Sequence, residues 1–591
     1  MCGINIIIST TNFPEKEPLL AMQKATLNRG PDASEIFIYE KEGWHLGIGV
    51  NRLHVVDNND QSNQPMISLC GNYVLAYNGE VYNYQDLKNQ LISKGYQFKT
   101  PSDTEVVLYW LQEFGGVGLS AFKGMFALVF IDLRKKEVTI GRDRHGIKPL
   151  FYFQTAERLI ISSSILAIES SGLANLSINN NAIDDYLAYR HVMGYHTFYT
   201  EVKSHEPGVI TQYDERLLAK NIILKQPSPS TEVNLGNILI ETTSLVVEAP
   251  ASPGLMLSGG VDSTLILAII NKDLAIRGID TYTLDTGEDS PWAKLASKQY
   301  ESRHHEIPVS VDVLQRLDEF LFNTDQPIAD HGAFAAWLVA EEANKNSNIL
   351  LSGAGADELF GGYNRHRAYQ YYLKHQHLVL AFKKVIDKLN IKGLLPKGWQ
   401  QFIKGVDQDP VSTYRKFLQN YAIKEITDDS KFWQSENIIT NNLIGALDFD
   451  KRNYLVADVL AITDNALMQK SVEGRVPFLY DDVVNFANHI SIEDKMKSRG
   501  KDPLKELLIK YNGLKYAKRT KQGFGLPLAT WLRDKKSEWL WDFIHRDSPL
   551  FMYCSKTTVL QLLQQHRSGK TDNSMQLWSI LVLEKWLSRI H

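Results

Sequence analysis

The period of the hydrophobic pattern changes near residue 225, and this change limits the fold more than any other feature of the chain. Before it, short apolar runs alternate with turns rich in Gly, Asn and Asp, which is typical of paired strands. Beyond it, apolar runs alternate with helical patterns, which is typical of βαβ units and a parallel sheet. The break, Lys225–Thr231, holds two prolines and three hydroxyl residues in seven positions, a linker composition. A chain of 591 residues exceeds one core, so we expect two domains, 1–224 and 225–591.

The first domain is predicted to be an α+β sandwich of sheets with flanking helices. Its opening strand is expected at Ile4–Ile8, a buried apolar run that fixes the N-terminus inside the fold. Further strands are expected at Trp44–Val50, Tyr73–Tyr77, Ala127–Ile131, Val138–Arg142 and Leu150–Phe153, and helices at Leu19–Asn28 and Asp103–Phe114.

The second domain is predicted to be α/β, with a parallel sheet followed by a helical part from about residue 365 to the end. Strands are expected at Leu255–Leu257, Thr281–Leu284, Ile307–Val309 and Asn348–Leu351, and helices at Asp262–Asn271, Pro291–Tyr300, Val311–Leu321 and Ala333–Asn344.

Charge and cysteine content exclude several classes of function. The formal charge of −4 gives no field for a polyanion, so nucleic acid and membrane surfaces are not expected as partners. No apolar stretch approaches the roughly 18 residues of a membrane span. The three cysteines are far apart and lack the spacing of zinc ligands, which argues against a disulfide framework and favours a reducing cytoplasm.

One of these cysteines, Cys2, lies directly behind the first methionine, in the segment MCGI. A small residue at this position allows the methionine to be removed, which leaves a thiol and a free α-amino group on one residue. An amine with a pKa of about 8 can take the proton from a thiol with a pKa of about 8.5. Cys2 is therefore a candidate nucleophile for attack on amides or esters.

Such a nucleophile needs hydrogen-bond donors where the oxyanion forms. The segment YNGEVYNY at residues 77–84 offers the amide of Asn78 and the backbone N–H of Gly79, at a predicted turn. Arg52 and Asp103, with the charged pair of the RGPD segment at residues 29–32, are suited to hold a zwitterionic amino acid.

These motifs together resemble the class II glutamine amidotransferase domain, an N-terminal-nucleophile hydrolase. The others that carry the resemblance are NRLHVVD with QPM, SDTE, GMFA and RDRHGIKPL. The resemblance implies that Cys2 hydrolyses glutamine to glutamate and ammonia, with Asn78 and Gly79 as the oxyanion hole. It also implies that Arg52, Glu80 and Asp103 hold the substrate's carboxylate and amino groups.

In the second domain, LMLSGGVDSTL at residues 255–265 predicts an anion site. Gly259 and Gly260 let the backbone approach a ligand, a helix N-terminus presents free N–H groups, and Ser258 and Ser263 add hydroxyl donors. The motif LLSGAGADELFGGY at residues 350–363 follows another apolar strand in the same way.

Acidic residues of the two motifs are candidates for a metal site. Asp357 brought near Asp262 would allow Mg²⁺ to bridge a triphosphate, because magnesium takes few protein carboxylates. Lys501 is a candidate to stabilise the departing pyrophosphate.

With SVEGRVPFL and KQGFGLPLATWL, these motifs resemble the synthetase domain of glutamine-hydrolysing asparagine synthetase. The resemblance implies a PP-loop ATP pyrophosphatase fold, Mg²⁺, ATP as a substrate, and a carboxylate acceptor that becomes an acyl adenylate and then takes up ammonia through a protected passage. A homodimer is common in that family. The implied pyrophosphate site is Ser258, Gly259, Gly260, Asp262 and Ser263; the implied adenylate site is Leu257, Leu284, Ser352 and Gly353; and the implied magnesium ligands are Asp262 and Asp357.

Three positions depart from the family pattern. Ala354 replaces a glutamate tied to adenylate formation, and Ser164 and Tyr480 replace an acidic residue each. Three interpretations therefore stay open: asparagine synthesis from aspartate, the same chemistry on another carboxylate such as a uronic acid sugar or a secondary metabolite, and a non-catalytic scaffold. The intact Cys2 and SGGVDS argue against the third.

Overall fold

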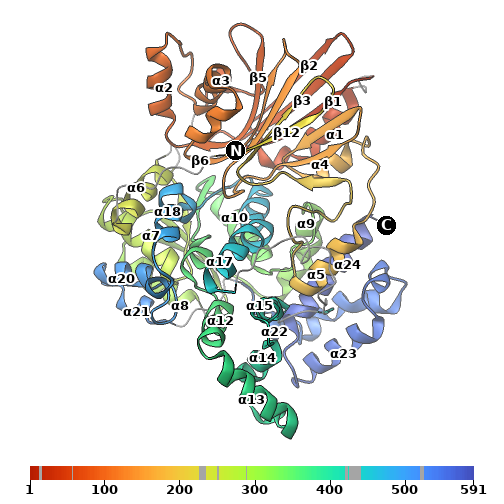
Figure 1. Cartoon of the computed structure of the whole chain (residues 1–591), viewed down its shortest axis with the longest axis vertical. Coiled ribbons are helices and arrows are strands. Elements are labelled where there is room, and N and C mark those ends of the chain that lie inside the picture. The colour runs from red at the N-terminus through yellow and green to blue at the C-terminus, as the bar shows by residue number, and fades with distance from the viewer. Residues whose placement is uncertain are drawn as a thin grey trace.

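The computed structural model describes the chain apart from residues 12–15, 56–57, 225–233, 249–251, 288, 420–422, 425–440, 520–524 and 591. The predicted linker Lys225–Thr231 lies outside the described residues. Two antiparallel sheets precede it and one parallel sheet follows it, and the two regions pack on each other (Figure 1).

The N-terminal region is a sandwich of two six-stranded sheets. The first has the order β10-β8-β9-β1-β3-β2 and the second β12-β11-β7-β6-β5-β4. The strands of the first sheet are β1 Cys2–Ser9, β2 Ala33–Lys41, β3 Trp44–Arg52, β8 Phe151–Gln154, β9 Arg158–Ser162 and β10 Val202–Ser204. Those of the second are β4 Met66–Ile67, β5 Tyr73–Val81, β6 Gly124–Asp132, β7 Glu137–Arg142, β11 Val209–Tyr213 and β12 Ala219–Ile223.

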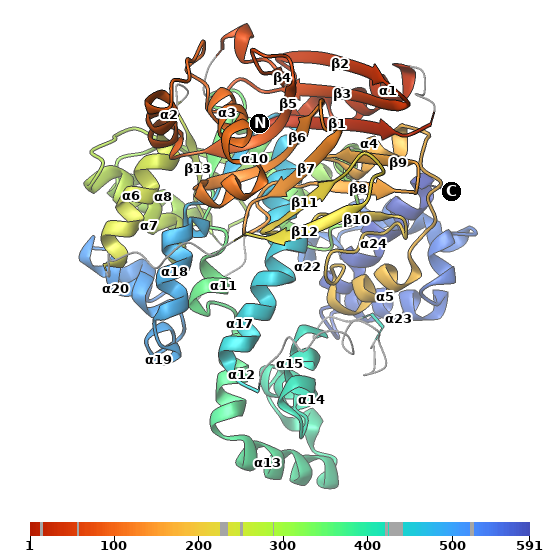
Figure 2. The same ribbon diagram turned by 45° about the horizontal axis from the view of Figure 1, so that its top comes forward.

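Apolar side chains from both sheets meet between them, and the central strands β1, β3 and β6 are buried along almost their whole length. Ile4, Ile6 and Ile8 of β1 are fully buried against Val74 and Val129 of the second sheet. Helices cover the outer faces: α1 (Lys16–Ala25) and α4 (Ile165–Ser170) lie on the first sheet, and α2 (Tyr84–Ser93) and α3 (Asp103–Phe114) on the second (Figure 2). The predicted sheet sandwich is confirmed.

The C-terminal region is built on a five-stranded parallel sheet with the order β15-β14-β13-β16-β17. Its strands are β13 Gly254–Met256, β14 Asp280–Asp285, β15 Arg303–Pro308, β16 Ile349–Leu351 and β17 Glu473–Arg475. The order reverses between β13 and β16, and ligands of open α/β sheets bind beyond the carboxyl ends of strands at such a point. The two glycine motifs follow β13 and β16.

Helices surround this sheet and form the rest of the region. Around the sheet lie α6 Leu235–Val247, α7 Val261–Lys272, α8 Ser290–Gln299, α9 Leu317–Phe322, α10 Gly332–Ala343 and α11 Ala356–Phe360. A projecting group comprises α12 Asn364–Lys374, α13 Gln376–Leu389, α14 Lys397–Gly405, α15 Pro410–Leu418 and α17 Leu443–Arg452. The last helices are α18 Asp481–His489, α19 Ile492–Lys495, α20 Asp502–Lys510, α21 Leu514–Ala517, α22 Leu528–Trp531, α23 Lys556–Arg567 and α24 Ser574–Ile590.

No helix within the described ranges is long and apolar enough to cross a membrane.

The structure corrects the sequence prediction at several elements. Asn78 and Gly79 do not form a turn, because β5 continues to Val81 and pairs with β6 throughout. Helix 311–321 is divided into a 3-10 turn, Val311–Arg316, and α9. Among the elements that were not predicted are β17, α2, α4 and a further helix, α5 (Asn180–Tyr189).

Salt bridges join the two regions at several points. Arg144 Nη1 lies 2.9 Å from Asp481 Oδ2, and His145 Nε2 lies 3.0 Å from Asp481 Oδ1, at the start of α18. Arg29 of the RGPD segment lies 2.8 Å from Asp464. The charged motifs of the N-terminal region therefore also hold it against helices of the C-terminal region.

Candidate active sites

Cys2 begins strand β1 and is paired with Arg52 of β3. Its side chain is only 4% exposed. Its backbone N–H donates to Asn78 Oδ1 at 3.1 Å, and its Sγ accepts from Gln64 Nε2 at 3.3 Å. Burial raises the pKa of the Cys2 thiol, although the terminal amine and Arg52 draw it down.

The two predicted oxyanion donors lie in β5 beside Cys2. Asn78 is fully buried, and its Nδ2 has no hydrogen-bond partner within the described part of the chain. A buried amide donor normally has an acceptor, so this one is available to a ligand. At Gly79 a Cβ atom would overlap Met125 O of β6, and only glycine fits there.

A cavity of about 30 Å³, measured as space for the centre of a water molecule, lies next to Cys2. The structure brings Arg52, Gly79, Glu80 and Asp103 together in its wall. Asp103 is held in place because its Oδ2 accepts from the Tyr77 hydroxyl at 2.8 Å and from Val81 N at 3.1 Å. Burial raises the pKa of Asp103, despite these hydrogen bonds.

Glu80 forms an ion pair with Arg475 of β17, on the other side of the domain contact. Arg475 also donates to Glu473 Oε1 at 2.7 Å, so one guanidinium holds two carboxylates. Burial raises the pKa of Glu80 to about 8. Burial alone would raise the pKa of Glu473 too, but Arg475 and the terminal amine outweigh it and lower that pKa to about 2.

The loop after β13 has the geometry of an anion cradle. Gly259 adopts a φ of +66°, and a Cβ there would overlap the backbone of Trp292 and Ala293. The Ser258 hydroxyl lies 3.2 Å from the Ser263 hydroxyl and accepts from Gly260 N at 3.3 Å. Helix α7 begins directly behind this loop, so its N-terminal N–H groups face the same space.

Three charged groups from separate segments meet beside that loop. Lys501 Nζ lies 2.6 Å from Asp262 Oδ2 and 2.8 Å from Asp357 Oδ1. The Lys501 side chain is 6% exposed. Burial alone would lower its pKa, but the two aspartates outweigh it and raise the pKa of Lys501 above its ordinary value. The amine therefore stays charged at neutral pH.

The remaining predicted nucleotide-site residues follow neighbouring strands of the parallel sheet. Leu257 and Leu284 are buried, and Leu257 N donates to Tyr282 O of β14 at 2.9 Å. Ser352 N donates to Arg475 O at 2.9 Å. A Cβ on Gly353 would lie 2.8 Å from the Asp262 Cβ, so this glycine lets the two motifs touch.

Strand β17 connects the two sites. Glu473, at its start, lines the cavity beside Cys2, and Arg475, at its end, bonds to Ser352 of the second glycine motif. The Met1 side chain is buried in a small apolar cluster with Leu53, Val55, Ile349 and Met468.

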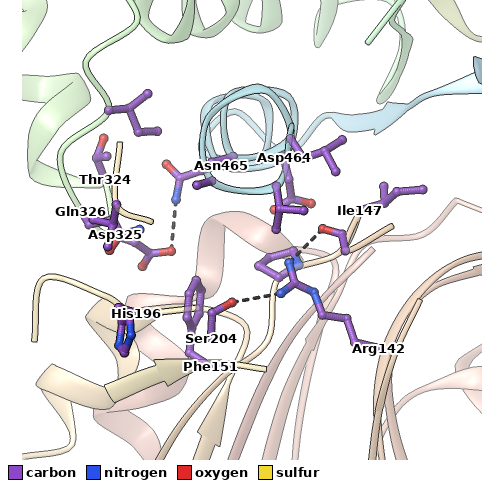
Figure 3. A pocket seen from close by; sticks show the side chains of 18 of the residues that line it. Arg142, Ile147, Phe151, His196, Ser204, Thr324, Asp325, Gln326, Asp464 and Asn465 are labelled. Atoms are coloured by element: carbon purple, nitrogen blue, oxygen red, sulfur yellow. Dashed lines mark hydrogen bonds between the residues drawn. The ribbon is translucent and has the colours of Figure 1, made fainter. Parts of the chain in front are cut away.

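A second cavity lies between the regions (Figure 3), with about 70 Å³ for the centre of a water molecule. On one wall Arg142 donates to the Ser204 hydroxyl at 3.0 Å, and on the other Asn465 donates to Asp325 Oδ2 at 3.2 Å. Ser164, one of the atypical positions, donates to Asp325 Oδ1 at 2.5 Å. Ser164 therefore lies at the contact between the two regions.

The other two atypical positions lie at different places. The Tyr480 ring packs 6.3 Å from that of Tyr82, across the domain contact. Ala354 lies in the loop after β16, where its N–H donates to the Ser352 hydroxyl at 3.3 Å. Its methyl group offers no proton donor or acceptor at that point.

Sequence reasoning assigned no role to four side chains in these sites. They are Gln64, Glu473, Arg475 and Arg519, the last of which donates to Ser258 O at 2.8 Å and pairs with Asp289. Gln64 lies in the motif QPM, and Glu473 and Arg475 both lie in the motif SVEGRVPFL. Their presence in these motifs was the available signal, and Arg519 had none. The segment Lys521–Phe524 of the KQGFGLPLATWL motif lies outside the described residues.

Two family models match the chain. One, described as asparagine synthase, matches residues 235–588, and one described as a glutamine amidotransferase domain matches residues 1–221. The first alone covers more than half of the chain.

Three relatives match this chain over most of their own length. The chain is 27% identical to asparagine synthetase (glutamine-hydrolysing) 1 of Bacillus subtilis, over 97% of this chain and 94% of that protein. It is 27% identical to a putative asparagine synthetase of Mycobacterium tuberculosis, over 95% and 91%. It is also 24% identical to amidase chry2 of Gibberella zeae, over 85% and 84%.

Proposed function

Because the chain belongs to the glutamine-hydrolysing asparagine synthetase family, we propose that it moves the amide nitrogen of glutamine to a carboxylate that ATP has activated. The observation that carries this proposal is strand β17, which touches the Cys2 cavity at Glu473 and the nucleotide motif at Arg475. A structural connection between the two sites is useful only if both react, with glutamine at the Cys2 cavity and with ATP at the nucleotide motif. We further propose residues 1–224 and 225–591 as the two domains.

The Cys2 site is suited to hydrolyse glutamine. With Met1 removed, the α-amine of Cys2 takes the thiol proton and the sulfur attacks the amide carbon. The carbon–nitrogen bond then breaks as the amine returns this proton to the nitrogen, ammonia leaves, and water hydrolyses the thioester to glutamate and the free thiol. The unpartnered Nδ2 of Asn78 and the N–H of Gly79 are assigned to the oxyanion. Arg52 is assigned to the carboxylate of glutamine, and Glu80 and Asp103 are assigned to its ammonium group. When glutamine is bound, Glu80 would therefore have two cationic partners, Arg475 and the substrate ammonium.

The second site is suited to cleave ATP between the α and β phosphates. The pyrophosphate is assigned to the loop from Ser258 to Ser263, and Lys501 offers it a fixed positive charge. The adenylate is assigned to Leu257, Leu284, Ser352 and Gly353.

The donor set beside this loop fits a magnesium ion. Asp262 and Asp357 both reach one point, which Lys501 occupies, and two carboxylates with phosphate oxygens are the ligands that Mg²⁺ prefers. Bound there, Mg²⁺ would neutralise charge on the phosphates. Lys501 can then turn from the carboxylates towards the pyrophosphate.

Ammonia has to pass from the first site to the second without protonation. The Met1 side chain fills an apolar position between Leu53, Val55, Ile349 and Met468, and its removal would clear that position. An apolar lining admits neutral ammonia and disfavours ammonium, because a charged group loses hydration there. We therefore assign the passage to this cluster and to β17.

Aspartate is the first candidate for the acceptor, by the names of the Bacillus and Mycobacterium relatives. Ala354 favours a second candidate, another carboxylate such as a uronic acid sugar or a secondary metabolite, because the missing glutamate leaves that loop without an acid or base. The three free cysteines support a reducing, cytoplasmic location. Because relatives are commonly dimeric, we propose a homodimer.

The test is pyrophosphate release with glutamine and ATP, measured against a panel of carboxylic acids that includes aspartate. Release that depends on aspartate establishes asparagine synthesis, and release that depends on another acid establishes the second candidate. If no acid supports release while glutamine is still hydrolysed, the transfer reaction is refuted. If neither activity is found, the chain is a non-catalytic scaffold.

A further inference from the structure

Helices α12, α13 and α14 project from the synthetase region, away from the antiparallel sheets (Figures 1 and 2). They follow the Asp357 motif directly, since α11 ends at Phe360 and α12 begins at Asn364. The mechanism proposed above uses no residue of α13 or α14. The surface of this projection is nevertheless unusual for a protein exterior.

Helix α13 carries an apolar stripe that faces solvent. Leu378, Phe382, Val385 and Leu389 are spaced four, three and four residues apart, so they share one face of the helix. Their exposed fractions are 72%, 44%, 51% and 59%. The side of the helix that packs against the protein is a different one, with Ile386 fully buried.

The stripe continues onto the neighbouring segments. Trp399 of α14 is 42% exposed, and its ring lies 6.2 Å from that of Phe382. Leu394, between the two helices, is 82% exposed. We call these six side chains, Leu378, Phe382, Val385, Leu389, Leu394 and Trp399, the apolar patch. A contiguous exposed patch of this kind marks an interaction surface.

Positive charge surrounds the apolar patch. Residues 376–405 contain six lysines and one aspartate and no glutamate, whereas the whole chain has a formal charge of −4. Lys384 and Lys388 immediately precede Val385 and Leu389, so they border the stripe on α13. Within the described residues, no acidic side chain forms an ion pair with Lys384, Lys388, Lys392 or Lys397.

We propose that the apolar patch and its lysines dock the protein onto an anionic lipid surface. Lysine on the polar side with Trp, Phe and Leu on the other is the composition of helices that lie in the headgroup region of a bilayer. Anionic headgroups attract the lysines, while the apolar side chains enter the acyl boundary.

A second copy of the chain fits this surface less well. An isologous contact through the patch would bring the lysines of both copies together without acidic partners from the same segment. The proposal departs from the prediction that no membrane surface would be a partner. That prediction used the net charge of the whole chain, which conceals the opposite local charge of this projection.

The test is co-sedimentation of the full-length protein with vesicles of phosphatidylcholine, alone or mixed with phosphatidylglycerol. We expect binding only to the mixed vesicles, with a loss on adding salt. Leu378→Gln with Phe382→Gln, and separately Lys384→Glu with Lys388→Glu, should each weaken binding at least tenfold. Glutaminase activity and pyrophosphate release should stay at the wild-type level, so this test is independent of the proposed function.

Matched controls lie elsewhere on the surface. Phe322→Gln alters a side chain that is 69% exposed, and Lys272→Glu with Lys298→Glu reverses two exposed charges. Both should leave vesicle binding unchanged. Absence of preferential binding, equal loss in the controls, or a solution dimer that only Leu378→Gln with Phe382→Gln dissociates would overturn the proposal. Binding of the patch to an acidic protein without binding to mixed vesicles would do the same.

Discussion

Replacing Lys501 by methionine tests the charge balance of the nucleotide site. The amine lies 2.6 Å from one aspartate and 2.8 Å from another, and all three side chains are less than one fifth exposed. At such distances each pair attracts with about 6 kcal/mol for an effective dielectric constant of about 20, before desolvation is subtracted. Breaking a buried pair costs about 3–5 kcal/mol because it leaves an uncompensated charge. We expect Lys501→Met to lower the free energy of unfolding by that amount.

Urea denaturation measures this loss, and two variants sharpen it. Lys510→Met alters an exposed lysine at the end of α20, the helix that begins directly after Lys501, and should change the midpoint little. Adding Asp357→Asn to Lys501→Met should recover most of the stability, because it removes the repulsion between two carboxylates. Millimolar Mg²⁺ should stabilise Lys501→Met more than the wild type, since the amine no longer competes for those oxygens.

The same variant should lose pyrophosphate release by about 10² to 10³-fold, the usual cost of removing one donor to a developing anion. Glutamine hydrolysis should remain. If Lys501→Met were as stable as Lys510→Met, the amine would not be balancing two carboxylates. If pyrophosphate release survived, its assigned role at the phosphates would be wrong.

Three further variants test the other assignments. Cys2→Ala should abolish glutamine use but leave free ammonia usable; equal loss with both nitrogen donors would contradict two separate centres. Asn78→Ala should lower kcat for glutamine hydrolysis by about 10² to 10³-fold with little change in KM, whereas a change in KM alone would assign the amide to binding. Burial, with Arg142 nearby, lowers the pKa of His205 to about 3, below the unfolded value of about 6.5, so its stabilisation is present above that value and is lost as pH falls towards 3. Between about pH 7 and about pH 5 the free energy of unfolding of the wild type should fall by about 2 kcal/mol because of His205. His205→Gln should remove this part of the pH dependence. If the urea midpoint of the variant changed between the two pH values as much as that of the wild type, the assignment to His205 would be refuted.

The sequence predicted the elements whose pattern is local. Helix α3 was predicted at its observed bounds from its helical pattern. The structure shows why it begins there, since the Ser102 hydroxyl caps the helix by accepting from Thr104 N. The strands β3, β6 and β7 were recognised from their apolar runs. In the candidate sites, the two glycine motifs were recognised because a strand followed by small residues and a helix is a narrow pattern.

Elements that depend on distant partners were not predicted. Strand β17 has three residues, Glu473, Gly474 and Arg475, and no apolar alternation; its place in the sheet comes from pairing with β16. Arg475 likewise forms its ion pair with Glu80, which lies nearly 400 positions earlier in the chain. No window of sequence contains both residues, so neither their ion pair nor the connection between the sites could be derived locally.

The burial of Met1 has a consequence for how active molecules arise. At 4% exposure, its peptide bond is out of reach of an aminopeptidase once the first strand has entered its sheet. Removal of Met1 must then be faster than the folding of the first strand, while the polypeptide is still emerging from the ribosome. On the proposed function, molecules that fold before excision would retain Met1 and could use only free ammonia. The ratio of the glutamine-dependent rate to the ammonia-dependent rate in a preparation would then report the fraction of molecules from which Met1 was removed.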